Sequence, residues 1–149
     1  MSSITLRFLA EPSTVNFGGK VHGGTVMKWI DEAGYACATR WAKQYCVTVS
    51  VGTIRFQRPI KIGDLVEVEA RLAYTGTTSM NISVEVRAGD IKLGEMQVIA
   101  ECLVVFVAVD SEGKSQAVQT WQPETPGDVA LAQQVKSQLD AARSMQLSS

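Results

Sequence analysis

The chain has 149 residues, of which 46% are hydrophobic and 19% are charged. This length and composition predict one globular domain with a sizeable buried core, and they exclude a generally disordered protein. The formal net charge is −1 and the basic residues are scattered, so nothing indicates binding to nucleic acid.

The apolar segments and the cysteines indicate the cellular compartment of the protein. The longest unbroken apolar run, residues 102–109, is too short to span a bilayer, and the first residues lack the apolar length of a secretory signal. Three cysteines, Cys37, Cys46 and Cys102, have no metal-ligand spacing and lie in apolar surroundings typical of reduced structural thiols. We therefore expect a cytoplasmic protein without a membrane segment or a metal site.

The first elements are a short strand and a long helix. Residues 4–9 alternate apolar and polar side chains, as a strand does, and a loop rich in glycine follows. Residues 24–43 predict a helix, because apolar side chains recur on one of its faces. Gly34 costs about 1 kcal/mol relative to alanine inside a helix, so we expect close packing against a sheet to offset that cost. Asp31 falls at the boundary of the apolar face, where we expect a half-buried carboxylate.

The rest of the central region, residues 47–110, predicts an antiparallel sheet. The segments 66–74 and 80–88 alternate clearly and are joined as a hairpin. The segment 95–109 becomes apolar on both faces from Cys102 onward, which indicates a central strand or one covered by a second subunit.

Two further features complete the predicted fold. The apolar residues of 47–51 and of 54–56 have opposite parity, which predicts a bulge near Gly52 and Thr53. Residues 128–145 predict a last helix. The fold class is therefore α+β, with a helix against one face of the sheet.

A possible reaction centre lies at the start of the long helix. Unpaired N–H groups at Gly23 and Gly24 would carry the positive end of the helix dipole, and Asp31 lies two turns further on. Donors that polarise a carbonyl, together with an acid that activates water, suit acyl transfer to water. Asn16, in the loop before the helix, is a third candidate residue of this reaction centre.

Each of these residues also has a purely structural interpretation. Asp31 can form an ion pair with Lys28 one turn earlier, and the side chain of Asn16 can hydrogen-bond to the backbone of its own turn. The glycine pair can allow the start of the helix to pack tightly on the sheet. His22, the one histidine, is better explained as a loop or capping residue than as a catalyst. No G-x-S-x-G elbow, Walker loop or metal-ligand set is present, so a nucleophilic triad, nucleotide binding and metal catalysis are not supported.

The run from Met27 to Gly34, with Asn16 and Gly23-Gly24 before it, resembles the acyl-CoA thioester hydrolases of the hotdog fold. The resemblance covers roughly residues 8–118. It continues through the motifs Val47-Thr-Val-Ser-Val51, Ile54-Arg-Phe56, Pro59, Gly63-Asp64, Gly76-Thr-Thr-Ser-Met80, Phe106-Val-Ala-Val-Asp110 and Gly113-Lys114.

The resemblance implies a single hotdog domain over residues 1–149, in which a curved sheet of about five antiparallel strands wraps the helix. It implies a homo-oligomer whose subunits pair sheets edge to edge, with a dimer as the minimal unit and a tetramer or hexamer left open. Asp31 would be general base or nucleophile, Asn16 would come from the neighbouring subunit, and the N–H groups of Gly23 and Gly24 would polarise the thioester oxygen.

The substrate implied is a fatty acyl-CoA, hydrolysed without a metal or a cofactor other than the coenzyme A of the substrate itself. The apolar face at Met27, Ile30 and Gly34 would line a tunnel for the acyl chain. Weaker candidates for contacts with coenzyme A are His22, Arg55, Arg58, Lys61, Arg71, Arg87, Thr77, Ser79 and Lys114.

One departure and two alternatives accompany this interpretation. Many relatives carry an acid where this chain has Gly52, which puts a second acid role in doubt. A non-catalytic acyl-CoA binder or sensor would keep the basic residues and the tunnel but would not need Asp31. A hotdog hydratase would need a His–acid pair, for which His22 is poorly placed.

Overall fold

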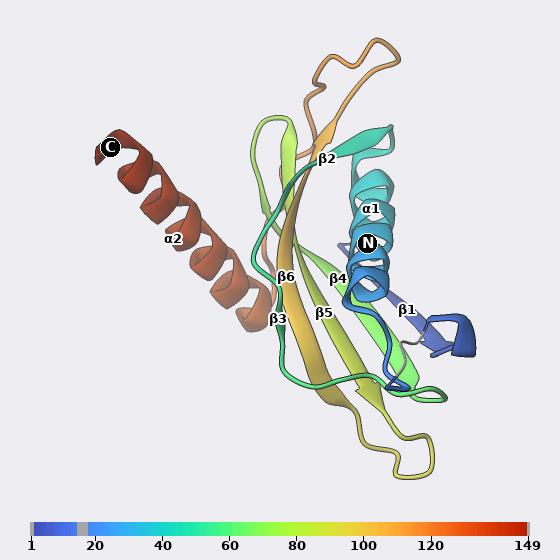
Figure 1. Ribbon diagram of the computed structural model, residues 1–149. Coiled ribbons are helices and arrows are strands. Elements are labelled where there is room, and N and C mark those ends of the chain that lie inside the picture. Colours follow the sequence, from blue (N-terminus) through green and yellow to red (C-terminus); the bar gives the residue numbers. More distant parts are fainter. Residues whose placement is uncertain (1, 15–17, 149) are drawn as a thin grey trace.

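The computed structural model of the protein describes residues 2–14 and 18–148. Six strands form one antiparallel sheet in the order β1-β4-β5-β6-β2, with β3 also beside β6. Helix α1 lies along one face of this sheet and helix α2 on the other (Figure 1). The arrangement confirms the predicted α+β fold. The elements are β1 Ser3–Leu9, the 3-10 turn η1 Pro12–Thr14, α1 Gly23–Ala42, β2 Cys46–Val51, β3 Arg55–Phe56, β4 Leu65–Thr75, β5 Ser79–Gly89, β6 Gln97–Ala108 and α2 Pro126–Ser148.

Close packing at Gly34 seats α1 on the sheet. A Cβ atom added there would lie 2.9 Å from Cε2 of Phe106, which is fully buried on β6. Glycine is therefore required by the approach of the helix to the sheet, as the sequence predicts. The same contact fills the space expected to hold an acyl tunnel. Ile30 is also only 1% exposed, so the predicted tunnel along Ile30 and Gly34 is wrong within one protomer.

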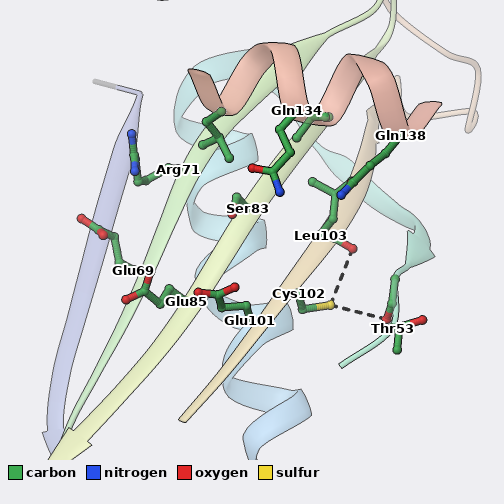
Figure 2. A pocket seen from close by; sticks show the side chains of 13 residues that line it. Thr53, Glu69, Arg71, Ser83, Glu85, Glu101, Cys102, Leu103, Gln134 and Gln138 are labelled. Carbon is green, nitrogen blue, oxygen red and sulfur yellow. Dashed lines mark hydrogen bonds between the residues drawn. The ribbon is translucent and has the colours of Figure 1, made fainter. Parts of the chain in front are cut away.

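The opposite face of the sheet carries charge, and Figure 2 shows it beneath α2. Arg87 lies among glutamates of β4 and β5, with its Nη1 atom 3.2 Å from both Glu69 and Glu85. Arg71 on β4 pairs with Asp128 at 2.6 Å and thereby holds the start of α2 against the sheet.

The edge beside β6 is irregular in two places. Between the pairs Val51–Val104 and Arg55–Glu101, three residues of the edge lie opposite two of β6, which agrees with the bulge predicted near Gly52 and Thr53. A second register shift, between Thr48 and Ser50, was not predicted. Strand β2 ends before Gly52, whose N–H donates to the carbonyl of Leu103 at 2.8 Å. A Cβ at Gly52 would lie 3.0 Å from that oxygen, so a side chain in this place requires a local shift of the backbone.

Capping groups explain the observed ends of the two helices. Helix α1 ends where Lys43 adopts a left-handed φ of 55°, and its N–H donates to the carbonyl of Thr39. Helix α2 begins two residues before the predicted start at residue 128, and the hydroxyl of Thr125 accepts a hydrogen bond from Asp128 N at 3.0 Å. Over residues 2–14 and 18–148, no helix combines the length and the apolarity needed to cross a membrane.

The three cysteines belong to the core. Cys37, Cys46 and Cys102 are buried free thiols. Burial raises the pKa of the Cys37 thiol to about 11, and desolvation likewise raises the pKa values of Cys46 and Cys102. Because the thiolate is the reactive form, these residues are poor nucleophiles at neutral pH.

The packing at Gly34 predicts a loss of stability on enlargement. Gly34→Val should lower the free energy of unfolding by about 1–3 kcal/mol, because the added atoms overlap the Phe106 ring. Glu32→Val, on the exposed side of α1, is the control and should change it by less than about 1 kcal/mol. Urea unfolding followed by circular dichroism measures both, and equal effects would show that α1 does not approach the sheet so closely.

The buried thiols predict resistance to alkylation. At pH 8 only about one Cys37 thiol in a thousand is ionised, so iodoacetamide should leave the folded protein unlabelled, and raising the pH toward 11 should increase labelling. Intact-mass measurement in buffer and in urea checks this. Labelling of Cys37 in the folded protein at the rate of an exposed thiol would contradict the described core.

Candidate active site at the start of helix α1

Backbone hydrogen bonds fix the segment that leads into α1. Val21 N donates to the carbonyl of Ile60, and His22 N donates to that of Thr14, both at 2.9 Å. The carbonyl of His22 then accepts from Thr25 and Val26. His22 therefore occupies the N-cap position through its backbone, while its exposed side chain makes no capping hydrogen bond.

Two donors remain free at this helix start. Within the described part of the chain, the N–H groups of Gly23 and Gly24 have no hydrogen-bond acceptor. Both residues are exposed, and a Cβ at Gly24 would meet no atom within 4 Å. Adjacent N–H groups at the positive end of a helix dipole form a site for negative charge. A carbonyl oxygen can therefore approach them directly.

A pocket of about 320 Å³, lined by both apolar and polar residues, borders Gly23. Its walls include Val26 of α1, Phe56 of β3 and Ile99 of β6, and Arg58 also lines it. The Phe56 ring sits 3.7 Å from where a Gly23 side chain would begin. An apolar group attached to the bound carbonyl thus has a place beside the helix start.

Asp31 is held by a residue that the sequence analysis missed. Thr48 Oγ1 lies 2.9 Å from Asp31 Oδ1, so the hydroxyl of β2 donates to the carboxylate of α1. Both residues are exposed in the single protomer, where we expected Asp31 to be half buried. The sequence signal for Thr48 was a polar residue between Val47 and Val49. Its hydrogen bond to Asp31 depends on how β2 lies beside α1, which a local sequence pattern does not predict.

The free donors and Asp31 are too far apart to act together within one subunit. Gly24 and Asp31 are seven residues apart on a continuous helix, and a rise of 1.5 Å per residue separates them by about 10 Å. Helical N–H groups also point toward the N-terminus, so a carbonyl bound at Gly24 lies still further from Asp31. The same subunit therefore cannot present both groups to one carbonyl.

The remaining predicted residues fall in three places. Arg55 is exposed on β3, and Arg58, which lines the pocket beside Gly23, bonds through Nη1 to Gln97 Oε1. Thr77 and Ser79 lie at the β4–β5 hairpin, which is at the far end of α1 from Gly23 (Figure 1). Asn16 lies outside the described residues.

The outer face of the sheet does not suit coenzyme A. A groove of about 510 Å³ lies between this face and α2. Glu69, Glu85 and Glu101 line it in one row across three strands (Figure 2), and Arg71 is already engaged by Asp128. Arg71 pairs with Asp128, and Arg87 pairs with Glu69 and Glu85, so both guanidinium groups already face carboxylates; their contacts with phosphate stay a prediction. Nor do the described residues contain a cluster of side chains able to hold a metal ion.

Comparison with known proteins agrees with this geometry. Residues 18–95 match the model of the thioesterase superfamily. The acyl-CoA thioester hydrolase YciA of Escherichia coli is 37% identical over 118 residues, which cover 77% of this chain and 89% of that protein. A hexameric acyl-CoA thioesterase in its apo form superposes with a TM-score of 0.92 at 28% identity, covering 97% of this chain and 93% of the other.

An acyl-CoA hydrolase from Staphylococcus aureus, solved with butyryl coenzyme A and coenzyme A, is also similar. It superposes with a TM-score of 0.90 at 28% identity and covers 99% of this chain and 90% of its own. Alanine variants of that enzyme have been solved at an asparagine in position 28, an aspartate in position 43 and a threonine in position 60 of its chain. On the shared fold, the family match and these identities, the chain belongs to the thioesterase superfamily, in the family of hotdog-fold acyl-CoA thioester hydrolases that includes YciA.

Proposed function

We propose that the protein hydrolyses acyl-CoA thioesters to a free acid and coenzyme A, at sites built between two subunits. The observation that carries the proposal is the hydrogen bond of Thr48 to Asp31, on the helix whose start offers two free N–H donors. The core of the hydrolase is residues 8–118, the whole chain is one domain, and α2 is an addition on the outer face. Three buried free thiols support a reducing, cytoplasmic compartment.

The spacing of the site residues supports this assignment. In the Staphylococcus aureus enzyme the substituted asparagine, aspartate and threonine are separated by 15 and then 17 residues. Asn16, Asp31 and Thr48 are the same residue types at the same separations. Thr48 is thereby a candidate site residue beside Asp31 and Asn16.

The chemistry assigns one role to each group. Thr48 donates to Oδ1 of Asp31 and fixes the orientation of the carboxylate, which leaves Oδ2 to take a proton from water. The water oxygen bonds to the thioester carbon, and the N–H groups of Gly23 and Gly24 stabilise the negative charge that develops on the carbonyl oxygen. The carbon–sulfur bond then breaks, and the sulfur leaves as the thiol of coenzyme A after receiving the proton.

A second subunit can bring Asp31 close to the N–H donors of Gly23 and Gly24, which lie too far from it within one subunit. β2 is an unpaired edge strand, and Val47, Val49 and Val51 on it are 37%, 55% and 49% exposed. An exposed apolar edge is a site for strand pairing. Antiparallel pairing of two β2 edges sets the α1 helices side by side in opposite directions, so the start of one helix faces the middle of the other. We propose this dimer as the catalytic unit and, because similar enzymes are hexameric, a larger assembly of such dimers.

Removal of the Asp31 carboxylate should strongly decrease the rate of hydrolysis. We expect Asp31→Ala to lower kcat by at least about a hundredfold, the scale of general-base catalysis. Thr48→Val should lower it by about tenfold, since one orienting hydrogen bond is lost. Release of free thiol from butyryl-CoA measures both, and Glu32→Ala, an exposed acid on the same helix, should remain active.

Two outcomes would count against this function. Normal turnover by a folded Asp31→Ala protein would exclude Asp31 as the base. Saturable binding of acyl-CoA by the unaltered protein, without release of thiol, would identify a binder or sensor instead.

Mixing of two inactive variants tests the shared site. If Asp31 of one subunit acts with Asn16 of the other, exchanged mixtures of Asp31→Ala and Asn16→Ala chains should recover about a quarter of the normal activity, since half of the dimers then hold one intact site. A mixture of Asp31→Ala with Asp31→Asn is the control and should stay inactive. No recovery in the first mixture, with subunit exchange shown by native mass spectrometry, would place both groups in one subunit.

A further inference from the structure

Met27 is the one large apolar side chain of α1 that is exposed in the single protomer. The structure describes this helix over its whole length, and its other large apolar side chains are buried or half-buried. Met27 is 49% exposed, whereas Ile30 on the same predicted apolar face is 1% exposed. A single exposed apolar residue is ordinary on a protein surface, so its position decides whether it has a function.

Met27 lies on the flank of α1 that carries the candidate site. At 3.6 residues per turn, it is about 40° from Asp31 around the helix axis and about 60° from Gly24. The other flank of α1 is covered, because Trp29 packs edge-to-face on Phe8 of β1 with ring centroids 4.7 Å apart. Met27 is therefore between the N–H donors and the carboxylate, on the flank whose Asp31 contacts β2.

Val51 of β2 extends this apolar surface. It is 49% exposed and pairs with the fully buried Val104 of β6, on the face of the sheet that α1 covers. A three-residue connection reverses the chain between α1 and β2, so a step back along α1 and a step forward along β2 lead the same way. Met27 precedes Asp31 by one turn, and Val51 follows Thr48 by three residues. Both therefore lie on the same side of the Asp31–Thr48 pair, and we call them the apolar strip.

The proposed dimer brings Met27 of both subunits to its two-fold axis. In that dimer Gly24 of each helix faces Asp31 of the other, so the axis passes each helix halfway between these positions, beside Met27 and Lys28. The two reaction centres are then about 10 Å apart along the helices. Two Met27 side chains lie between them.

The thioester carbon carries two arms that need different surroundings. The coenzyme A arm must reach solvent. The pocket beside Gly23, which Gln57 and Arg58 line together with apolar residues, offers the amides and methylenes of this arm a route to the surface. The acyl arm has no polar group and needs no exit, so the apolar strip is the surface that suits it.

The length of the acyl arm then decides how many substrates one dimer holds. An extended chain advances about 1.3 Å per carbon, because a carbon–carbon bond is about 1.5 Å long. Beyond its carbonyl, a butyryl group extends about 4 Å and stops before the axis, which is about 5 Å away. A lauroyl group extends about 14 Å, which passes both the axis and the second reaction centre.

We propose that the two sites of a dimer share one acyl chamber, walled by the apolar strips of both subunits, in which two short acyl groups bind together but one long acyl group excludes a second. Met27 is the specificity-determining residue, because the two Met27 side chains occupy the space at the axis through which a long chain must pass. Their flexible side chains can fold aside for one chain but leave no room for two. This inference rests on the proposed function and adds to it a dependence of occupancy on chain length.

The test counts bound ligand by isothermal titration calorimetry of the full-length protein. The ligands are ketone analogues of butyryl-CoA and lauroyl-CoA, in which a methylene between sulfur and carbonyl prevents hydrolysis. The butyryl analogue should bind once per subunit, and the lauroyl analogue once per two subunits. Met27→Ala should raise the lauroyl ratio toward one per subunit. Glu32→Ala, an exposed position on the same helix, is the control and should keep it at one per two.

The outcomes separate this inference from the proposed function. A lauroyl analogue that binds once per subunit, or not at all, would overturn the inference. So would a ratio of one per two subunits for both analogues, because half occupancy would then not depend on chain length. Equal lauroyl ratios in Met27→Ala and Glu32→Ala would overturn the role of Met27. Release of thiol from butyryl-CoA is measured in parallel. Its absence, with the ratios as expected, would refute the hydrolase and leave the shared chamber standing.

Discussion

The rise of the α-helix sets the strictest limit on how this protein can work. Gly24 and Asp31 share one continuous helix, and two turns of that helix separate them by about 10 Å. The free N–H groups also point away from the acid. Neither group can be moved toward the other without breaking the helix, so a reaction that needs both must use two helices. The proposed dimer follows from this limit and not only from similarity to other enzymes.

Packing of α1 against the sheet provides the second half of the arrangement. Because Gly34 has no side chain, Phe106 on β6 approaches the helix backbone, and β2 beside β6 is brought next to α1. Thr48 on β2, the next element along the chain, then reaches Asp31. The contact that stabilises the core thus also orients the carboxylate, whereas the exposed valines of β2 leave the same strand available for a partner.

The sequence predicted those features that depend on local periodicity. Alternation located β4 and β5, the apolar face located α1, and the slim helix middle indicated the close approach at Gly34. It did not predict contacts that depend on register, such as Thr48 with Asp31 or Arg71 with Asp128. The tunnel predicted along Ile30 and Gly34 is absent from the single protomer for a related reason, because an apolar face on a helix indicates burial but not whether a neighbouring ring fills the space. The Phe106 ring does fill it.

A crystal structure of the Asp31→Asn protein with butyryl-CoA bound would test the central claim most directly, because this substitution keeps the shape of the side chain while removing its basicity. We expect the thioester oxygen to accept hydrogen bonds from the helix start of one subunit, with the substituted side chain at position 31 of the other subunit facing the thioester carbon. A ligand held by the helix start and position 31 of the same subunit would contradict the account. So would a position 31 side chain directed into bulk solvent in every assembly.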